Sequence, residues 1–161
     1  MAIKYKLKSF SDLSPIELYD VLKLRQDVFV IEQECIYPDC DNYDQEGMHL
    51  IGYDGHEIAT YLRILKPGMT YEKYSSIGRV IIATSYRKRG LSRNLLTIAI
   101  EYLRKKHPTH DIKISAQSHL EKMYASLGFK KSGSPYLEDG IPHIPMVLAF
   151  LRSSASIQSD S

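Results

Sequence analysis

A run of basic residues around one glycine could form an anion-binding turn in this chain. It comprises Arg87, Lys88, Arg89, Gly90, Leu91 and Ser92. An apolar segment at 77–84 precedes it and residues with helical spacing follow, so the turn lies at a predicted helix start. Unpaired backbone N–H groups and the helix dipole favour negative charge there, and Gly90 lets the backbone approach a ligand closely. The pattern predicts a site for a phosphate group of a cofactor. The alternative is a solvated basic turn.

Two common phosphate-loop signatures are excluded at this turn. A Walker A loop would end in Gly-Lys followed by Ser or Thr, and a dinucleotide fingerprint would contain further glycines. The residues around Gly90 provide neither pattern. The residues around Gly90 alone therefore do not distinguish a phosphate site from a solvated basic turn.

Hydrophobic spacing and turn residues predict the elements that position this turn. A helix should begin at the capping box Ser14–Glu17 and run to about Val30, before an acidic, irregular loop at 32–47. A second helix should run from Leu91 to His107, and a third from another capping box at Ser118 to Gly128. Strands are expected at 4–9, 48–53, 57–65, 77–84, 111–117, 130–137 and 143–150.

The order of these elements predicts the fold class. Strands 48–53 and 57–65 should form a hairpin with its turn at Asp54-Gly55. Strand 77–84 lacks polar alternation at its centre, which favours a position in mid-sheet with both faces buried. The whole order indicates an α/β fold, with a mixed sheet and helices on its faces, and argues against a doubly wound Rossmann repeat.

Composition favours an ordinary globular domain. The chain has 161 residues and a formal net charge of +2, too mild to indicate a nucleic-acid or membrane partner. We expect one domain at 1–151 and a disordered polar tail at 152–161. The first ten residues lack the apolar run of a signal peptide, so the cytoplasm is the expected location. Cys35 and Cys40 match no zinc spacing and are expected to be free thiols, with no metal bound.

Two motifs resemble a known family. Arg87-x-x-Gly90-x-Ser92, preceded by residues 79–82 (RVII), resembles the pyrophosphate-binding signature of the GNAT N-acetyltransferases, with Ser92 in place of the usual Gly or Ala. Residues 117–129 (QSHLEKMYASLGF) resemble a later family motif of an amide, a tyrosine and Gly-Phe. Segments 24–33, 49–52 and 138–144 are similar to the ElaA-type subgroup. The resemblance spans nearly all of the chain except the tail.

This resemblance implies a GNAT fold and acetyl-CoA as co-substrate. The fold would have a mixed, mostly antiparallel sheet of about six to seven strands flanked by helices, with a V-shaped splay between the fourth and fifth strands. A backbone N–H of the fourth strand, around Ile81 or Ile82, would hold the thioester carbonyl, and Val80 would also bind the cofactor. Residues 87–92 would hold the pyrophosphate, and Gln117 the pantetheine arm. Tyr124 would contact the cofactor and protonate the departing thiolate. Gln117 and Tyr124 could instead serve as a helix cap and a core residue.

The acceptor amine needs a general base, because an ammonium with a pKa of about 10 is not a nucleophile at neutral pH. Glu32, His143 and Glu34 are candidates, directly or through water. His143 has a suitable ordinary pKa of about 6.5, but it could simply be satisfied by backbone groups at a strand start. Glu32 could instead be solvated surface. Arg25, on the inner side of the first helix, is expected to be buried and paired with an acid.

The resulting hypothesis is an acetyl-CoA-dependent N-acetyltransferase that acts by direct attack in a ternary complex, without metal. The acceptor would be a primary amine of a small molecule or of a protein, and a homodimer is one expected state. The acidic loop 32–47 slightly favours polyamines, amino-group metabolites or protein lysines. One alternative is a non-catalytic CoA-binding module. Another is an acyltransferase like the acyl-homoserine-lactone synthases, because Arg25-x-x-Val28-Phe29 is similar to their start.

Overall fold

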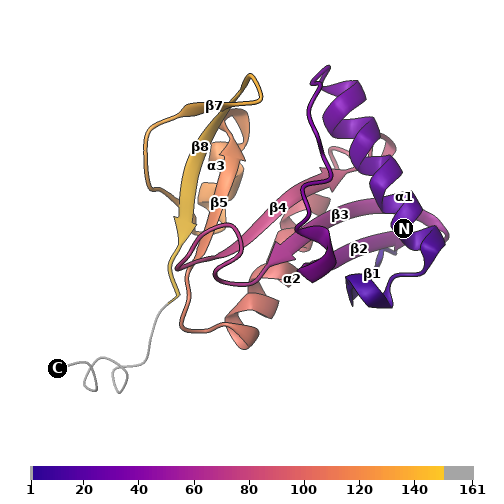
Figure 1. Cartoon of the computed structure of the whole chain (residues 1–161), viewed down its shortest axis with the longest axis horizontal. Coiled ribbons are helices and arrows are strands. Elements are labelled where there is room, and N and C mark those ends of the chain that lie inside the picture. The colour runs from indigo at the N-terminus through magenta and orange to yellow at the C-terminus, as the bar shows by residue number, and fades with distance from the viewer. Residues whose placement is uncertain (1, 151–161) are drawn as a thin grey trace.

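One sheet organises the computed structural model, which describes residues 2–150 (Figure 1). The expected tail at 152–161 and the last residue of the expected domain lie outside these residues. The sheet order is β1-β2-β3-β4-β5-β8-β6, and β7 pairs with β8 beside this path. The strands are β1 (Lys4–Ser9), β2 (Met48–Asp54), β3 (Glu57–Leu65), β4 (Ser75–Ile82), β5 (Ile112–Gln117), β6 (Lys130–Lys131), β7 (Tyr136–Glu138) and β8 (Ile141–Leu148).

Two halves of the sheet diverge between β4 and β5. These strands form the sheet's parallel pair, and they pair only at their beginnings, Ser75 with Ile112 and Ser76 with Lys113. All other strand pairs are antiparallel. Beyond Ser76 the two strands separate, and Figure 1 shows them as the arms of a V. The predicted mixed, mostly antiparallel sheet and its splay are confirmed, with eight strands because two short ones, β6 and β7, are included.

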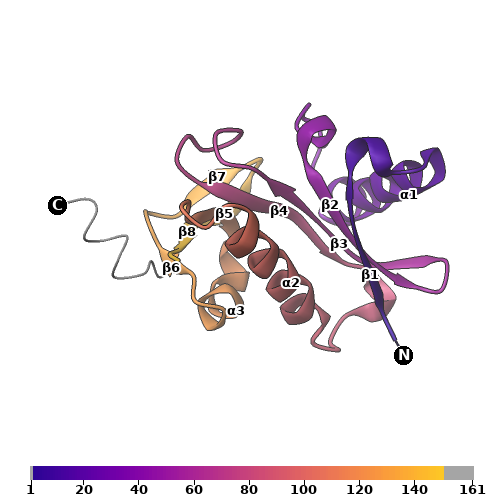
Figure 2. The ribbon, with the colours of Figure 1, turned by 90° about the horizontal axis from the view of Figure 1, so that it is seen from below.

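Helices cover both faces of the sheet (Figure 2). They are η1 (Phe10–Asp12), α1 (Pro15–Arg25), η2 (Gln26–Glu32), η3 (Asp44–Glu46), η4 (Thr84–Tyr86), α2 (Leu91–Lys106), η5 (Ser118–Leu120) and α3 (Glu121–Ser126). α2 buries Leu95, Ala99 and Leu103 in the larger core, together with Leu62 and Ile112.

The opposite face of the sheet carries the smaller core under α1. Ile51 and Tyr61 pack there with Val21 and Val28. Their strand neighbours Leu50 and Leu62 belong to the other core, as the alternation of side chains along a strand requires. No helix within residues 2–150 is long and apolar enough to cross a membrane.

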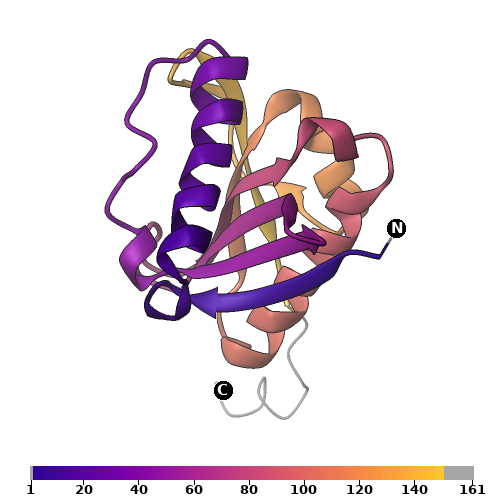
Figure 3. The same cartoon turned by 90° about the vertical axis from the view of Figure 1, so that its right-hand side faces the viewer.

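The first helix begins as predicted and ends differently. Ser14 Oγ accepts a hydrogen bond from the Glu17 backbone N–H, and the Glu17 carboxylate accepts one from the Ser14 N–H. This confirms the capping box. After Arg25 the chain continues as the π-helical segment η2 to Glu32, two residues past the expected end. Figure 3 shows the chain then returning alongside α1 towards η3. π-Helical turns are frequent at functional sites.

Glu17 gives the fold a measurable pH dependence. Its hydrogen bonds to Lys8, at 2.8 and 3.0 Å, and to the Ser14 N–H lower the pKa of Glu17 to about 2. A lowered folded-state pKa stabilises the protein above the unfolded-state value of about 4.3 and is lost as pH falls towards 2. Glu17→Gln should therefore lower the free energy of unfolding at pH 7, and the difference from wild type should vanish near pH 2. Urea titrations across this range would test it, and an equal deficit at both pH values would contradict it.

Four local predictions need correction. The tight turn between β2 and β3 consists of Gly55-His56, one residue later than expected, with Gly55 at a φ of +64°. Ser118 forms no capping box, because η5 precedes α3 and Leu120 occupies the N-cap. The expected strand 130–137 is divided into β6 and β7, and β8 begins at Ile141 rather than at 143. The turn at Asp139-Gly140 has positive φ at both residues and tightens this last hairpin.

The expectation for strand β4 is half right. It lies in mid-sheet, but Gly78, Arg79 and Val80 are only partly buried. The sheet splays at this level, so one edge of β4 has no neighbouring strand. The continuous apolar residues of β4 therefore belong to a strand that borders a cleft. A ligand bound in the cleft could cover their exposed parts.

Candidate active site

A cleft of about 750 Å³ lies where the sheet splays. Its walls come from η2, the following loop, β4, the start of α2, β5, α3 and the β7-β8 hairpin. Most of the predicted site residues line it: Glu32, Val80, Ile81, Ile82, Arg87, Ser92, Gln117, Tyr124 and His143. The other predicted residues, Lys88, Arg89, Gly90, Leu91 and Glu34, are not part of this lining.

The turn before α2 has the backbone of an anion site. Gly90 is the N-cap of α2 in the left-handed conformation, with φ +72°, and Lys88 has φ +63°. Within residues 2–150 no side chain caps this helix start, so these residues leave the N–H groups of its first turn available to a ligand. Leu91 is buried against Ala59 and Tyr86, which fixes the helix start on the sheet.

The basic residues of this turn take different positions. Lys88 and Arg89 are exposed, and the Arg89 guanidinium lies over the Tyr86 ring at 5.5 Å. Arg87 turns into the cleft, where its Nε donates to the Ile82 carbonyl at 2.9 Å. The side chains of Lys88 and Arg89 therefore contribute charge near the turn, whereas Arg87 takes part in the cleft wall.

A bulge shapes the β4 edge of the cleft. Tyr61 pairs with Ile81 while Arg63 pairs with Gly78, so β4 has one residue more than β3 in this interval. Arg79 takes the left-handed conformation there, with φ +53°. Beyond the bulge the Ala83 N–H donates to the Ala59 carbonyl of β3. Because N–H groups alternate along a strand, the Ile82 N–H points away from β3, towards the splay.

Tyr124 projects into the cleft from α3 on the opposite side. The side chain is buried, with 5% of the residue exposed, and packs edge-to-face on Phe129 at 5.7 Å. Burial raises the pKa of Tyr124 to about 12. The phenol therefore keeps its proton at neutral pH, and its hydroxyl makes no hydrogen bond to any residue between 2 and 150. It is both a core residue and a possible proton donor.

Glu32 and Arg87 meet across the cleft. Both terminal nitrogens of Arg87 lie 3.0 Å from the two carboxylate oxygens of Glu32, which forms a bidentate ion pair. This pair joins the end of η2 to the turn before α2. The candidate base and the candidate pyrophosphate-binding residue are thus each other's partners.

If residues 87–92 bind the pyrophosphate of CoA, as the family resemblance implies, Glu32→Gln should increase CoA affinity by about two- to fivefold. An exposed ion pair contributes about 0.2–1 kcal/mol, and removing it frees the Arg87 guanidinium for a phosphate. Isothermal titration calorimetry with CoA at low and high salt would measure this. Glu34→Gln is the matched control, because Glu34 is exposed outside the cleft lining. A loss of affinity in E32Q would contradict the competition between carboxylate and phosphate.

His143 lies on β8 with both ring nitrogens in defined surroundings. Nδ1 is 2.7 Å from the Ile141 carbonyl, so Nδ1 carries a proton and donates it. Nε2 is 3.4 Å from a Glu138 carboxylate oxygen, and the ring stacks on Tyr136. The backbone contact predicted as the alternative for this histidine is present, and His143 also lines the cleft. Gln117 contacts Gln33 at 3.5 Å, which links β5 to the end of η2.

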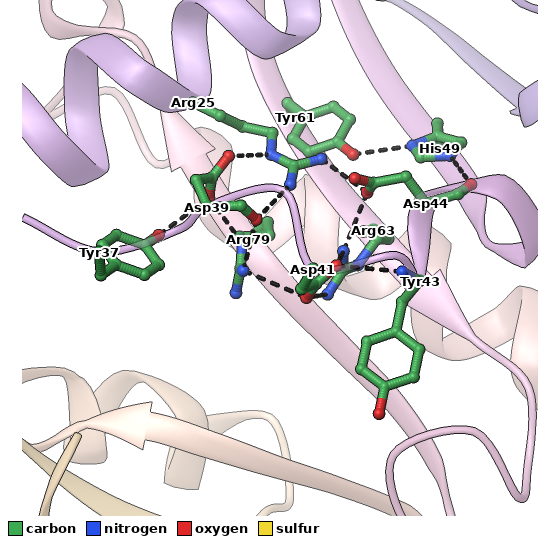
Figure 4. Close-up of polar contacts among 10 residues, drawn as sticks. All are labelled: Arg25, Tyr37, Asp39, Asp41, Tyr43, Asp44, His49, Tyr61, Arg63 and Arg79. Atoms are coloured by element: carbon green, nitrogen blue, oxygen red, sulfur yellow. Dashed lines mark hydrogen bonds and ion pairs between the residues drawn. The ribbon is translucent and has the colours of Figure 1, made fainter. Parts of the chain in front are cut away.

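Three arginines and three aspartates form an ion-pair network (Figure 4), and three of its members, Asp41, Arg63 and Arg79, line the cleft. Arg25 is completely buried and pairs with Asp39 and Asp44, as expected of a buried arginine. Arg63 pairs with Asp41 and Asp44, and Arg79 pairs with Asp39 and Asp41. These contacts lower the pKa of Asp41 and Asp44 despite their burial.

Sequence reasoning found only Arg25 of this network. The available signal was the acidic spacing Asp39-x-Asp41-x-x-Asp44, together with arginines inside two apolar strands. The network changes the meaning of the acidic loop, because each of these carboxylates is already engaged by a guanidinium. Asp39, Asp41 and Asp44 therefore are not free negative charges for a cationic acceptor, whereas Glu34 and Glu46 of the same loop are exposed. Cys35 and Cys40 are free thiols as predicted, and Cys35 Sγ contacts the Asp139 carbonyl.

The splayed mixed sheet and its cleft are the features of an acyltransferase fold. Comparison with known proteins gives the same class. A family model described as an acetyltransferase (GNAT) domain matches residues 23–150. The chain therefore belongs to the GNAT acetyltransferase family. Within it the chain is of the ElaA type: it is 39% identical to protein ElaA of Escherichia coli over 145 residues, which cover 89% of this chain and 94% of that protein.

Solved structures support the same assignment. An acyl-CoA N-acyltransferase from Pseudomonas aeruginosa superposes with a TM-score of 0.87 at 35% identity, covering 92% of this chain and all of that one. ElaA from Escherichia coli gives a TM-score of 0.86, also at 35% identity, with the same coverage. The acyl-homoserine-lactone synthase BjaI, at 18% identity and a TM-score of 0.73, shares the fold. The match with BjaI covers 99% of this chain and 89% of the BjaI chain.

Proposed function

We propose that this protein transfers the acetyl group of acetyl-CoA to a primary amine by direct attack in a ternary complex. The observation that carries the proposal is a single cleft bordered by an unpaired β4 edge, the uncapped start of α2 and the Tyr124 phenol. These three features match the needs of thioester aminolysis. Those needs are a donor for the carbonyl oxygen, a site for the pyrophosphate and an acid for the leaving thiolate.

In the proposed reaction the neutral amine nitrogen attacks the thioester carbonyl carbon. The oxyanion that forms accepts a hydrogen bond from the β4 backbone, for which the Ile82 N–H has the suitable direction. The C–S bond then breaks and the thiolate takes the Tyr124 proton. The former amine nitrogen loses one further proton, which returns to the Tyr124 phenolate directly or through water, and the neutral amide and the free CoA thiol are the products. The proton of the original ammonium goes to a base, for which Glu32 and His143 are the cleft candidates. Glu34 is less suitable because it lies outside the cleft lining.

Residues 87–92 and Gln117 are proposed to hold the cofactor itself. The pyrophosphate would accept hydrogen bonds from the turn and from the Arg87 guanidinium once Glu32 releases it. Ser92 lines the cleft and is small enough to let the cofactor approach. Gln117 would bind the amide groups of the pantetheine arm from the β5 side.

A screen of amine acceptors with acetyl-CoA, followed by release of the free CoA thiol, tests the proposal. The expected result is release above background hydrolysis with at least one primary amine, and mass spectrometry of the product should show one added acetyl group. The acceptor panel would contain small amines and lysine peptides, since both remain proposed acceptors. Thermal stabilisation by acetyl-CoA without any acetylated product would favour the CoA-binding module instead. No stabilisation at all would refute the cofactor site.

A further inference from the structure

Arg79 has a conformation that a strand residue rarely adopts. It is a non-glycine residue at φ +53°, placed in the bulge of β4 next to the backbone that is proposed to hold the thioester. Such a conformation costs about 1–3 kcal/mol and persists only where surrounding contacts hold it. Bulges of this kind commonly redirect a side chain beside an active site. The bulge therefore determines where the Arg79 side chain lies beside the cleft.

The surroundings of Arg79 fix its guanidinium rigidly. Nε lies 2.8 Å from an Asp39 carboxylate oxygen, and one terminal nitrogen, Nη2, contacts the Asp39 carbonyl at 2.9 Å and Asp41 at 3.2 Å. The Tyr37 ring lies 5.7 Å from the guanidinium carbon, and the Tyr37 hydroxyl donates to Asp39. A guanidinium held in this way loses little freedom when it binds a ligand.

The other terminal nitrogen, Nη1, is left unused. It has no hydrogen bond or ion pair to any residue between 2 and 150, and Figure 4 shows it pointing away from the aspartates with no dashed line. Arg79 lines the cleft, and 22% of its side chain is exposed. Two N–H donors of a positively charged group thus have no partner among residues 2–150, at a residue that lines the cleft.

The donor group left over at this end of the cleft, Nη1 of Arg79, favours an anionic group over a cationic one. The three aspartates of the network are paired with three arginines, so none remains to hold an ammonium. On the β7-β8 side, Glu138 and His143 provide a carboxylate and an imidazole. An acceptor with an amine near His143 and a carboxylate near Arg79 would complement both sides.

We propose that Arg79 is a specificity-determining residue that binds a carboxylate of the acceptor, so that preferred acceptors are amines that also carry a carboxylate, such as free amino acids. Planar guanidinium and carboxylate groups form charge-assisted hydrogen bonds in this geometry. The inference rests on the proposed acetyl transfer and adds the chemical class of the acceptor. It disfavours polyamines, which have no group for Nη1.

Matched substrate pairs test the inference. Each amino acid is compared with its decarboxylated amine at saturating acetyl-CoA: lysine with cadaverine, ornithine with putrescine, and phenylalanine with phenethylamine. Wild type should favour the carboxylated member by about tenfold or more in kcat/KM, as expected of a charge-assisted hydrogen bond. Arg79→Gln should raise KM for that member about tenfold and change the decarboxylated one by less than about twofold. Arg79→Lys should recover part of the preference.

Arg104→Gln is the matched control, because Arg104 is an exposed arginine outside the cleft lining. The inference is overturned if wild type uses the decarboxylated amines equally well or better. It is also overturned if R79Q lowers both members of a pair alike, since that indicates a structural role alone. The wild-type pairs decide the question even if R79Q fails to fold.

The inference and the proposed function can fail separately. If no acceptor is acetylated, the proposed function is wrong for this panel, and calorimetric binding of the same pairs to the CoA-bound protein then tests Arg79. The carboxylate site would be supported if the wild-type protein binds the amino acids but not their decarboxylated amines, and if R79Q no longer binds the amino acids. Equal binding of both members, or no binding of either, would refute it.

Discussion

Tyr124→Phe is expected to lower kcat for acetyl transfer by about 100-fold while changing KM for acetyl-CoA by less than about threefold. The variant keeps the ring that packs on Phe129 and removes only the hydroxyl that faces the cleft. The pKa of Tyr124 is raised to about 12 by burial, so the phenol carries its proton at neutral pH. That proton is the one proposed to go to the thiolate. Without it the thiolate must leave as an anion or be protonated by water.

Steady-state kinetics with the best acceptor from the screen would measure this effect. Tyr102→Phe is the matched control, since Tyr102 is a partly buried tyrosine whose pKa is also raised by burial, but it lies outside the cleft. Equilibrium binding of acetyl-CoA to Y124F should stay close to that of wild type. An unchanged kcat in Y124F would mean that Tyr124 serves only as a core residue. Its burial is consistent with that alternative.

Asp44→Asn should destabilise the fold by about 3 kcal/mol, and the melting temperature should fall by roughly 6–12 °C. Asp44 is 5% exposed and its Oδ1 contacts both Arg25 and Arg63, at 2.7 and 2.9 Å. The substitution keeps the shape of the side chain but removes the charge that neutralises two buried guanidinium groups. Breaking a buried pair in this way is costly because the remaining charge has lost its solvent and its partner.

Acid titration gives the same prediction a second readout. The folded-state pKa of Asp44 is lowered, so its contribution is present above the unfolded-state value of about 3.9 and is lost as the pH falls through the folded-state value. Wild type should therefore lose more stability on acidification than D44N. Asp27→Asn, at an exposed position of η2, is the control and should change stability by less than about 0.5 kcal/mol. A small effect of D44N would mean that water reaches the network.

Local sequence signals predicted most elements because their causes are local. The capping box at Ser14, the buried spacing of α2 and the left-handed glycine at its start all depend on residues a few positions apart. The motif around Gly90 and the tyrosine of α3 were assigned to one site by family resemblance, and the structure does place Arg87, Ser92 and Tyr124 on one cleft. Their catalytic and binding roles stay predictions.

Two predictions made from local sequence patterns, at Ser118 and in β4, were wrong. Ser118 reads as a helix cap, but the short η5 turn inserts before α3 and leaves the Ser118 hydroxyl buried without a hydrogen-bond partner in the described chain. The continuous apolar run of β4 reads as a strand covered on both faces, whereas the splay leaves its centre bordering the cleft. In both cases the outcome depended on elements that lie far away in the sequence.

Residue types at fixed short spacings were sufficient to predict the family and the order of strands and helices. They also predict an anion-binding turn at 87–92, which stays a prediction. Only the tertiary structure decided which charges are available to a substrate. It paired Glu32 with Arg87 across 55 residues and engaged the aspartates of the acidic loop with arginines of α1, β3 and β4. Ion pairs form between groups that folding brings within a few ångströms, and composition records only that the charges exist.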